Sequence, residues 1–244
     1  MASELPPEDD RRTSPWASRR WQASALFLAV VVVAGGVVLM TTGSPDDGKT
    51  AAPTSSAGGP PASGQGPGCP GLTASQDIPR TAPAADWDLV STVAVPTSKD
   101  SGPAVVEGDI ARCYAHSPTG ALIAAAQIGT RYAFADDWKK VVEEQTYGDG
   151  KELLLETRGA YEETAEPVAP VPGELGQFAG YQFVTYTPET AVLQMVSRFD
   201  QGVMQVSTVT LRWADGDWQY EIPSVTPPQK TVTSLEGYVV WGGL

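Results

Sequence analysis

The stretch VMQVSTVTLRWADGDWQYEI, residues 203–222, determines the fold class that the sequence predicts. Its first eleven residues follow a period of two, which is typical of a β-strand. The dipeptide Asp215-Gly216 then favours a two-residue hairpin turn. The faces expected to be apolar carry Val203, Val209, Leu211 and Trp213 on the first strand, and Trp218, Tyr220 and Ile222 on the returning strand.

Two earlier segments alternate in the same way, GYQFVTY at 180–186 and AVLQMVSRF at 191–199. The turn residues Asp200-Gln201-Gly202 connect the second of them to the stretch quoted above. Tight turns join antiparallel neighbours in a sheet. We therefore predict a curved antiparallel sheet built as a meander.

Three helices are predicted before this meander. The first begins at Ser117-Pro118, an N-cap followed by proline at position N1, and its small residues can pack closely on a sheet. The second begins at Asp136-Asp137 and ends at Gly148, a natural C′ residue. The third begins at Asp149, and Glu152 completes a capping-box pattern. Helices followed by an antiparallel sheet predict an α+β domain with the helices on one face.

The segment before these helices predicts less regular structure. Residues 43–68 are mostly Gly, Pro, Ser, Thr and Ala, a composition that forms a flexible linker. The extracytoplasmic domain is expected to span residues 69–244. Its first part, up to Gly108, is expected to be irregular, with one short strand within residues 86–96 and a turn at Ser101-Gly102-Pro103.

An uncharged apolar stretch, ASALFLAVVVVAGGVVLMTT at residues 23–42, predicts a single transmembrane helix. About 20 helical residues span a hydrocarbon core of about 30 Å. Residues 1–22 are expected to be a disordered polar arm. This arm has four arginines, so the positive-inside rule places the N-terminus in the cytoplasm and the C-terminal domain outside the cell. The alternative is a cleaved signal peptide, whose apolar region is usually only about 7–15 residues long.

The charge of the outer domain argues against one class of partner, and its two cysteines predict a disulfide. From Cys69 onward the sequence has 11 Lys or Arg and 23 Asp or Glu, a net charge of −12, which repels phosphate and argues against direct binding of nucleic acid. Cys69 and Cys113 both lie on the outer side, where a disulfide between them is expected. Two separate buried thiols are the alternative.

The search for catalytic or metal-binding residues finds no spacing typical of a known site. His116 is the only histidine, and its place beside a helix N-cap favours a structural or solvent-facing role. The adjacent pairs Asp136-Asp137 and Glu143-Glu144 fit a helix N-terminus and a solvated face better than a catalytic pair. Glu162, Glu163 and Glu166 lack the loop of a calcium site. We expect no enzymatic activity, no metal and no cofactor.

Aromatic residues are concentrated on the predicted sheet and the second helix. Packing in the core between sheet and helices is their first explanation, and a ligand pocket or docking groove is the second. The residues concerned are Trp138, Tyr181, Phe183, Tyr186, Phe199, Trp213, Trp218 and Tyr220.

The order of three helices and a curved sheet ending in Trp213-x-x-Gly216-x-Trp218 resembles the nuclear transport factor 2-like (NTF2-like) cone fold. Behind a single membrane anchor and a linker, this domain looks like the bitopic subunits of type IV secretion and conjugation channels. The strings Gly102-Pro103, AHSPTGA at 115–121 and Trp241-Gly242-Gly243 are similar to membrane proteins of actinobacterial integrative and conjugative elements. The resemblance covers residues 86–244.

This resemblance implies a structural subunit of a DNA-transfer channel that binds other channel proteins, or further copies of itself. Two alternatives stay open, because the same fold hosts several functions. One is a cell-surface module that holds a small apolar ligand among the aromatic residues. The other is an extracytoplasmic enzyme, for which His116 is the only candidate base with a near-neutral intrinsic pKa.

Overall fold

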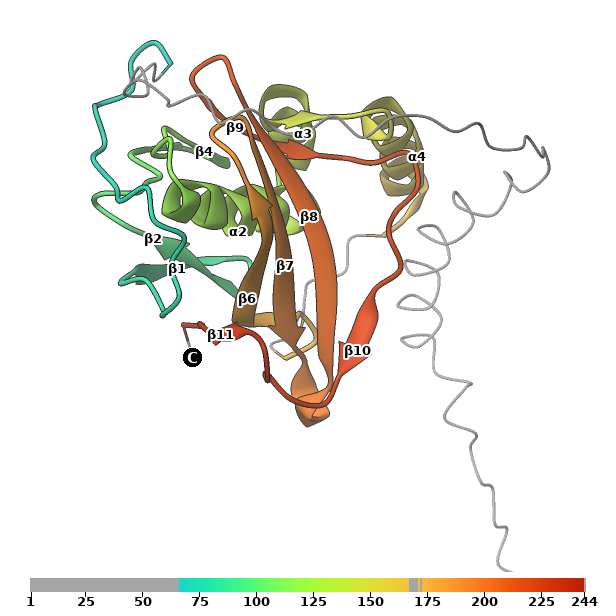
Figure 1. Cartoon of the computed structure of the whole chain (residues 1–244). Coiled ribbons are helices and arrows are strands. Elements are labelled where there is room, and N and C mark those ends of the chain that lie inside the picture. The colour runs from blue at the N-terminus through green and yellow to red at the C-terminus, as the bar shows by residue number, and fades with distance from the viewer. Residues whose placement is uncertain (1–65, 167–170, 172, 244) are drawn as a thin grey trace, which may run out of the picture. The chain divides into compact units, whose positions relative to one another are not determined.

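A seven-stranded sheet is the main layer of the domain (Figure 1). The structure is a computed structural model, and it describes residues 66–166, 171 and 173–243. Six strands lie in the order β11-β6-β7-β8-β9-β5, and β10 pairs with the start of the long strand β8. The strands are β5 (Thr146–Tyr147), β6 (Gln177–Tyr186), β7 (Thr190–Arg198), β8 (Met204–Ala214), β9 (Asp217–Glu221), β10 (Lys230–Val232) and β11 (Val239–Val240).

Strands β6 to β9 confirm the predicted meander, because each pairs antiparallel with the next one along the chain. Asp215 and Gly216 connect β8 to β9 with φ angles of 55° and 81°, as a type I′ turn requires. Aspartate and glycine tolerate this backbone better than most residues do. The turn therefore sets the register of the hairpin, in which Ala214 lies opposite Asp217.

The sheet is mixed, so the expectation of a purely antiparallel sheet is wrong at one edge. β5 runs parallel to β9, with Thr146 opposite Tyr220. A parallel pair needs a long connection. Here the connection contains the third helix and three strands of the meander, so the constraint is met.

Helix α2 (Pro118–Phe134) lies against one face of the sheet (Figure 1). Ser117 is its N-cap, as predicted, and the Ser117 hydroxyl oxygen accepts a hydrogen bond from the Gly120 N–H at 3.0 Å. Leu122 of this helix has no exposed surface and packs in one core cluster with Leu211 of β8. The first helix is thus the central element of the core.

The second helix, α3 (Trp138–Gln145), begins directly after Asp136-Asp137, as predicted, but ends before Gly148. Thr146 and Tyr147 leave the helix because they pair with β9 at the edge of the sheet. The predicted end at Gly148 was therefore wrong, because β5 lies between the end of the helix and that glycine.

The third helix, α4 (Lys151–Thr164), has Gly150 as its N-cap and no side-chain hydrogen bond at that position. The predicted capping box of Asp149 and Glu152 is therefore wrong. The Gly150 N–H instead donates to the Ile222 carbonyl at 3.0 Å, so contact with the end of β9 determines where the helix begins.

The segment before α2 contains four strands rather than one. β1 (Asp86–Val90) and β2 (Val93–Thr97) form one antiparallel hairpin, and β3 (Val105–Glu107) and β4 (Ile110–Arg112) form another. The turn of the first hairpin places Ser91 at a φ of 54°. A serine at positive φ is uncommon, so the sequence carries no clear turn signal there.

The two halves of β8 bury opposite faces of the strand. Val209 belongs to the α2 side of the sheet, whereas Met204 and Val206 pack on the opposite side with Val196. Val203 lies outside the strand and is 44% exposed, so placing it on the apolar face of β8 was wrong. The C-terminal residues Val232, Leu235 and Tyr238 cover this second cluster.

The predicted cytoplasmic arm (1–22), transmembrane helix (23–42) and most of the linker (43–68) lie outside the described residues. Within the described part of the chain, none of the helices combines the length and the apolar character that a membrane crossing needs.

Candidate functional site

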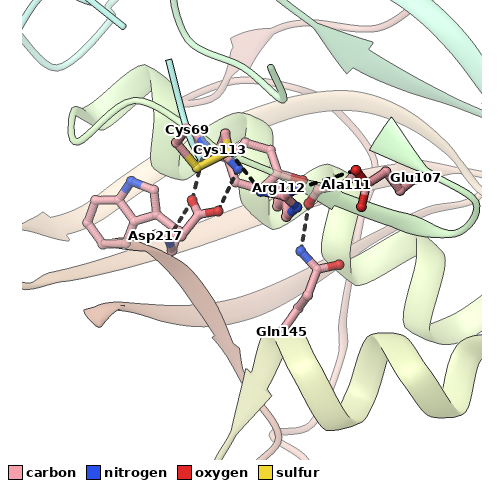
Figure 2. The surroundings of a disulfide bond; sticks show 9 residues. Cys69, Glu107, Ala111, Arg112, Cys113, Gln145 and Asp217 are labelled. Atoms are coloured by element: carbon pink, nitrogen blue, oxygen red, sulfur yellow. Dashed lines mark hydrogen bonds and ion pairs between the residues drawn. A yellow bond between two sulfur atoms is a disulfide. The ribbon is translucent and has the colours of Figure 1, made fainter. Parts of the chain in front are cut away.

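The two cysteines form a disulfide, as predicted, and it lies at the first described residues of the domain (Figure 2). The bond joins Cys69 to Cys113, whose Cα atoms are 5.3 Å apart. Close to it, the Gly66 N–H donates to the Gly216 carbonyl at 2.9 Å. The end of the linker is therefore attached both to the strand β4 side of the domain and to the β8–β9 turn.

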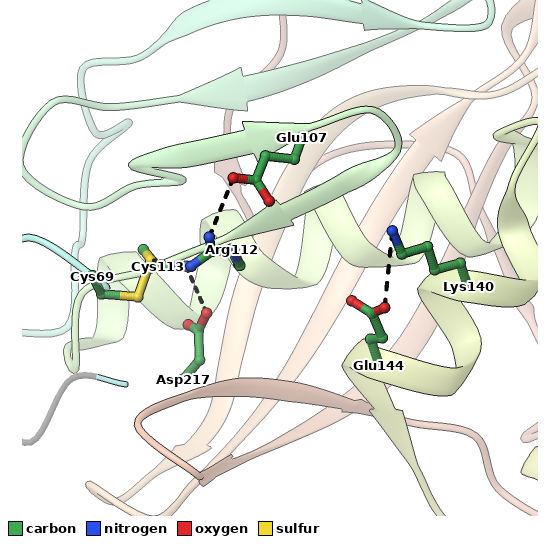
Figure 3. Close-up of polar contacts among 7 residues, drawn as sticks. All are labelled: Cys69, Glu107, Arg112, Cys113, Lys140, Glu144 and Asp217. Carbon is green, nitrogen blue, oxygen red and sulfur yellow. Dashed lines mark hydrogen bonds and ion pairs between the residues drawn. A yellow bond between two sulfur atoms is a disulfide. The ribbon is translucent and has the colours of Figure 1, made fainter. Parts of the chain in front are cut away.

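Asp217, the first residue of β9, connects β9 to the backbone at Cys113, and this contact and the disulfide are here called the junction (Figures 2 and 3). Its carboxylate accepts hydrogen bonds from the backbone N–H groups of Cys113 at 2.6 Å, Tyr114 at 3.0 Å and Trp218 at 2.9 Å. Burial raises the pKa of Asp217 above its ordinary value, and the three N–H donors and the positive charge of Arg112 oppose that rise. These donors satisfy the half-buried carboxylate, which indicates a structural role.

Arg112 covers the same junction from the outside (Figure 3). Its Nη1 atom lies 3.6 Å from Cys113 Sγ, and its Nη2 atom lies 3.4 Å from Glu107 Oε1. The nearby pair of Lys140 and Glu144 is separated by 4.0 Å on the exposed side of α3. Exposed ion pairs of this kind contribute little to stability.

His116 is half-buried and stacks on Trp213, with ring centroids 4.1 Å apart. Its Nε2 atom lies 2.6 Å from the Pro188 carbonyl oxygen. A carbonyl oxygen only accepts hydrogen bonds, so Nε2 must carry a hydrogen and donate it. The only histidine of the chain is thus held between a tryptophan and the β6–β7 turn.

Most of the predicted aromatic set lies in or against the core. Tyr181 and Trp218 are at most 1% exposed, Tyr220 is also buried, and Phe183, Tyr186 and Trp213 pack against the same cluster. Trp138 is buried between α3 and α4. The structure therefore brings six of the eight together around α2, where the apolar side chains fill the space between helix and sheet.

Phe199, the eighth residue of the set, lies elsewhere, at an open pocket of about 290 Å³. Phe178, Leu175 and Val240 provide apolar walls, and Arg198 and Asp200 provide charged groups. His116 does not line this pocket.

The acidic residues considered in the sequence lie on the surface. Asp136, Asp137, Glu143 and Glu144 are exposed, and so are Glu163 and Glu166. Glu162 is exposed as well, and its carboxylate accepts a hydrogen bond from Trp138 Nε1 at 2.8 Å. Among residues 66–166, 171 and 173–243, no group of three or more Asp, Glu, His or Cys side chains has the arrangement of a metal site.

Polar contacts attach helix α4 to the domain, and Gly159 is its only buried residue in the described structure. Arg158 stacks on Trp138 at 4.0 Å, donates to the Tyr132 carbonyl at 2.7 Å and pairs with Glu162 at 2.9 Å. Lys151 Nζ donates to the carbonyl oxygens of residues 143 and 146.

The face of α4 opposite these contacts is open to solvent. Leu153 and Tyr161 are 41% and 40% exposed, and Ala160 and Thr164 are exposed as well. The run Leu153-Leu154-Leu155 suggests this exposure, because three successive residues point in three directions around a helix and cannot all face the core.

The domain described above is an α+β unit with a disulfide at its entry, a filled core and one weakly buried helix. Residues 51–240 match a protein family described as a domain of unknown function (DUF8175), and the chain belongs to this family. Neither the curated proteins nor the solved structures contain a match to the chain.

Proposed function

We propose that this protein is a membrane-anchored assembly subunit of a conjugative DNA-transfer apparatus of the type IV secretion kind. Residues 23–42 are its single transmembrane helix, with the N-terminus in the cytoplasm and the domain outside the cell. It acts by binding other membrane or channel proteins, and copies of itself where the assembly requires them, rather than by catalysis.

One observation carries this proposal: α2 fills the face of the sheet on which a cone-shaped enzyme would need a cavity. Leu122, Ile123 and Leu211 there have no exposed surface. A ligand or substrate would have to displace a close-packed core, which costs several kcal/mol for each large side chain. The filled core therefore supports a domain that acts through contacts on its surface.

The disulfide gives further support to the extracytoplasmic placement. Disulfides form and persist mainly in oxidising compartments and are rare in the cytosol. The bond between Cys69 and Cys113 therefore fits a domain that is exported.

The test combines deletion with purification of the intact chain from its own cells. Deleting the gene should reduce conjugative transfer to background, and expression of the full chain should restore it. The tagged full chain, solubilised in mild detergent, should sediment with other membrane proteins. Normal transfer after deletion, together with a full chain that sediments as a lone monomer, would overturn the proposal.

A second candidate function is the binding of a small amphipathic ligand in the pocket beside Phe199. The combination of Phe178, Leu175 and Val240 with the guanidinium of Arg198 favours an apolar molecule that carries an anionic group. Medium-chain carboxylates should then raise the melting temperature of the full chain. Phe199→Ala should abolish this shift, and an equal shift in both proteins would exclude the pocket as the site.

A further inference from the structure

We propose that the exposed face of α4 is a docking surface for a basic amphipathic helix of a partner protein. This inference rests on the proposed function and names the surface and the chemistry of its partner. The surface, here called the α4 stripe, consists of Leu153, Thr157, Ala160, Tyr161 and Thr164.

The geometry of the helix makes the stripe continuous. Its members recur at i, i+4, i+7, i+8 and i+11, the spacing of one helix face. None of them is charged, although α4 has six charged residues among its fourteen. The outward side of α4 is therefore neutral along its length, while Leu154 and Gly159 on the other side meet the domain.

The charges beside the stripe define the partner. Glu152, Glu156 and Glu163 recur at i, i+4 and i+11 along one edge, and all three are exposed. None of them forms an ion pair within the described part of the chain. Along the other edge, Arg158 is already engaged by Glu162 and by a backbone carbonyl. The free charge next to the stripe is therefore negative.

A complementary surface has apolar residues facing the stripe and lysine or arginine facing the glutamate row. An amphipathic helix supplies both with one face and one edge, which is a common mode of helix recognition. Charge complementarity also steers such a partner towards the domain. Anionic lipid headgroups would meet the glutamate row and be repelled.

A second copy of this chain fits the stripe less well. In an antiparallel pair around a two-fold axis, the glutamate edge of each α4 would face the same edge of its symmetry mate. Like charges in that arrangement are destabilising. The outer domain also carries a net charge of −12 from Cys69 onward, so two copies repel each other over a longer range.

The test uses the full chain in nanodiscs of zwitterionic lipid, with empty nanodiscs as the blank, and a labelled 18-residue helical peptide. The peptide has a leucine face with lysines along one edge. Two matched peptides replace the lysines by glutamates or the leucines by serines. Fluorescence anisotropy should show that the lysine peptide binds at least about tenfold more tightly than either matched peptide.

Variants of the chain locate the binding. Leu153→Ser with Tyr161→Ser, and separately Glu152→Lys with Glu156→Lys, should each weaken binding about tenfold. All four residues are exposed, so these substitutions should leave the fold intact. An unchanged melting temperature of each variant checks this. The controls are Val225→Ser and Glu236→Lys, exposed residues outside α4 that should leave binding unchanged.

Equal binding of all three peptides, or equal loss in the control variants, would overturn the proposal. So would concentration-dependent self-association that Tyr161→Ser abolishes, because the occupant would then be a second copy. Co-purification with membrane proteins tells a failure of the α4 stripe from a failure of the proposed function. If the Leu153→Ser, Tyr161→Ser chain keeps its partners, the stripe is not the docking surface although the proposed function stands. If the wild-type chain has none, the proposed function itself fails.

Discussion

At the scale of single residues, the buried and half-buried polar groups of this domain differ in how well their hydrogen bonds are satisfied. Asp217 accepts three backbone hydrogen bonds, and Tyr181 Oη lies 3.2 and 3.1 Å from the carbonyl oxygens of Pro79 and Thr81. Tyr186 Oη, in contrast, is buried with no hydrogen-bond partner among the described residues. The cost of removing each group should follow this difference, because leaving a buried partner unpaired costs more than removing an unpaired group.

Asp217→Asn should lower the free energy of unfolding by about 1–3 kcal/mol. An amide offers one acceptor oxygen, and its NH2 group would face one of the three backbone N–H donors. Thermal denaturation of the full chain under non-reducing conditions measures the loss. The control is Asp215→Asn in the adjacent turn, which is exposed and has a φ of 55° that asparagine tolerates well. Equal stability of the two variants would contradict the structural role of Asp217.

A matched pair of tyrosine variants should respond in opposite ways at neutral pH. Tyr181→Phe should cost about 1 kcal/mol because it removes a buried hydrogen bond. Tyr186→Phe should be neutral or stabilising because it removes an unpaired hydroxyl. Chemical denaturation at pH 7 measures both, and a larger loss for Tyr186→Phe than for Tyr181→Phe would refute the assignment.

The same tyrosines predict how stability depends on alkaline pH. Burial raises the pKa of Tyr181 to about 12 and, together with the charge of Glu189, raises the pKa of Tyr186 to about 12. Between pH 10 and 12 the unfolded chain loses these phenolic protons while the folded chain keeps them, so stability falls as pH rises. Denaturation curves should show a smaller fall for the Tyr181→Phe, Tyr186→Phe double variant, and an unchanged fall would contradict the shifts.

At the scale of elements, close backbone contacts outweigh helix propensity at the start of α2. Gly120 lies so near the backbone of Ala115 that a Cβ atom would overlap it. The Ser117 N–H also donates to the Ala115 carbonyl at 2.8 Å, so this backbone has little freedom to move. The tight turn before α2 therefore depends on the missing side chain.

Gly120→Ala should destabilise the domain by about 2 kcal/mol, although alanine is the better helix former by about 1 kcal/mol. The overlap involves backbone atoms, which cannot rotate away as a side chain can. Gly71→Ala is the control because nothing lies within 4 Å of the added methyl group. Differential scanning calorimetry of the full chain compares the two, and a stabilised Gly120→Ala chain would show that the turn relaxes.

Strong local patterns made some elements predictable from the sequence. The period of two and the Asp215-Gly216 turn predicted the meander, and Ser117-Pro118 predicted the start of α2. The strands β5, β10 and β11 have two or three residues each, too few to show any period. They form because the ends of α3 and of the chain reach a free sheet edge, which is a tertiary effect.

The candidate site was less predictable than the fold. The pairing of Cys69 with Cys113 was foreseen because the chain has only two cysteines. Asp217 was not singled out, since its role depends on backbone N–H groups about a hundred residues away in sequence. The outward face of α4 was missed because the sequence pattern does not say which side of a weakly amphipathic helix meets the domain.

At the scale of the whole molecule, the disulfide joins the beginning of the domain to its core. It closes a loop between residues 44 positions apart. Cys113, at one end of the bond, is buried and is followed shortly by α2, whereas Cys69 is the point where the linker arrives. Segments that are far apart in the chain therefore depend on one covalent bond.

Cys113→Ser, or reduction of the wild-type chain, should lower the free energy of unfolding by up to about 4 kcal/mol, the loop-entropy value for a loop of this size. Cys69→Ser should give the same melting temperature as Cys113→Ser, and reductant should have no further effect on either variant. A Cys113→Ser chain that melts like the oxidised wild type would show that the bond adds nothing to stability.

The position of this bond also decides how the domain would respond to mechanical force. Tension arriving along the chain before Cys69 would pass through the sulfur–sulfur bond to Cys113. It would bypass residues 70–112, including the two short hairpins, which would be slack under load. The pull would enter the fold beside the first turn of its central helix, at a backbone that Asp217 clamps to the sheet. After reduction of the disulfide, the force would act on the segment that contains the two hairpins, and the hairpins would then unfold first.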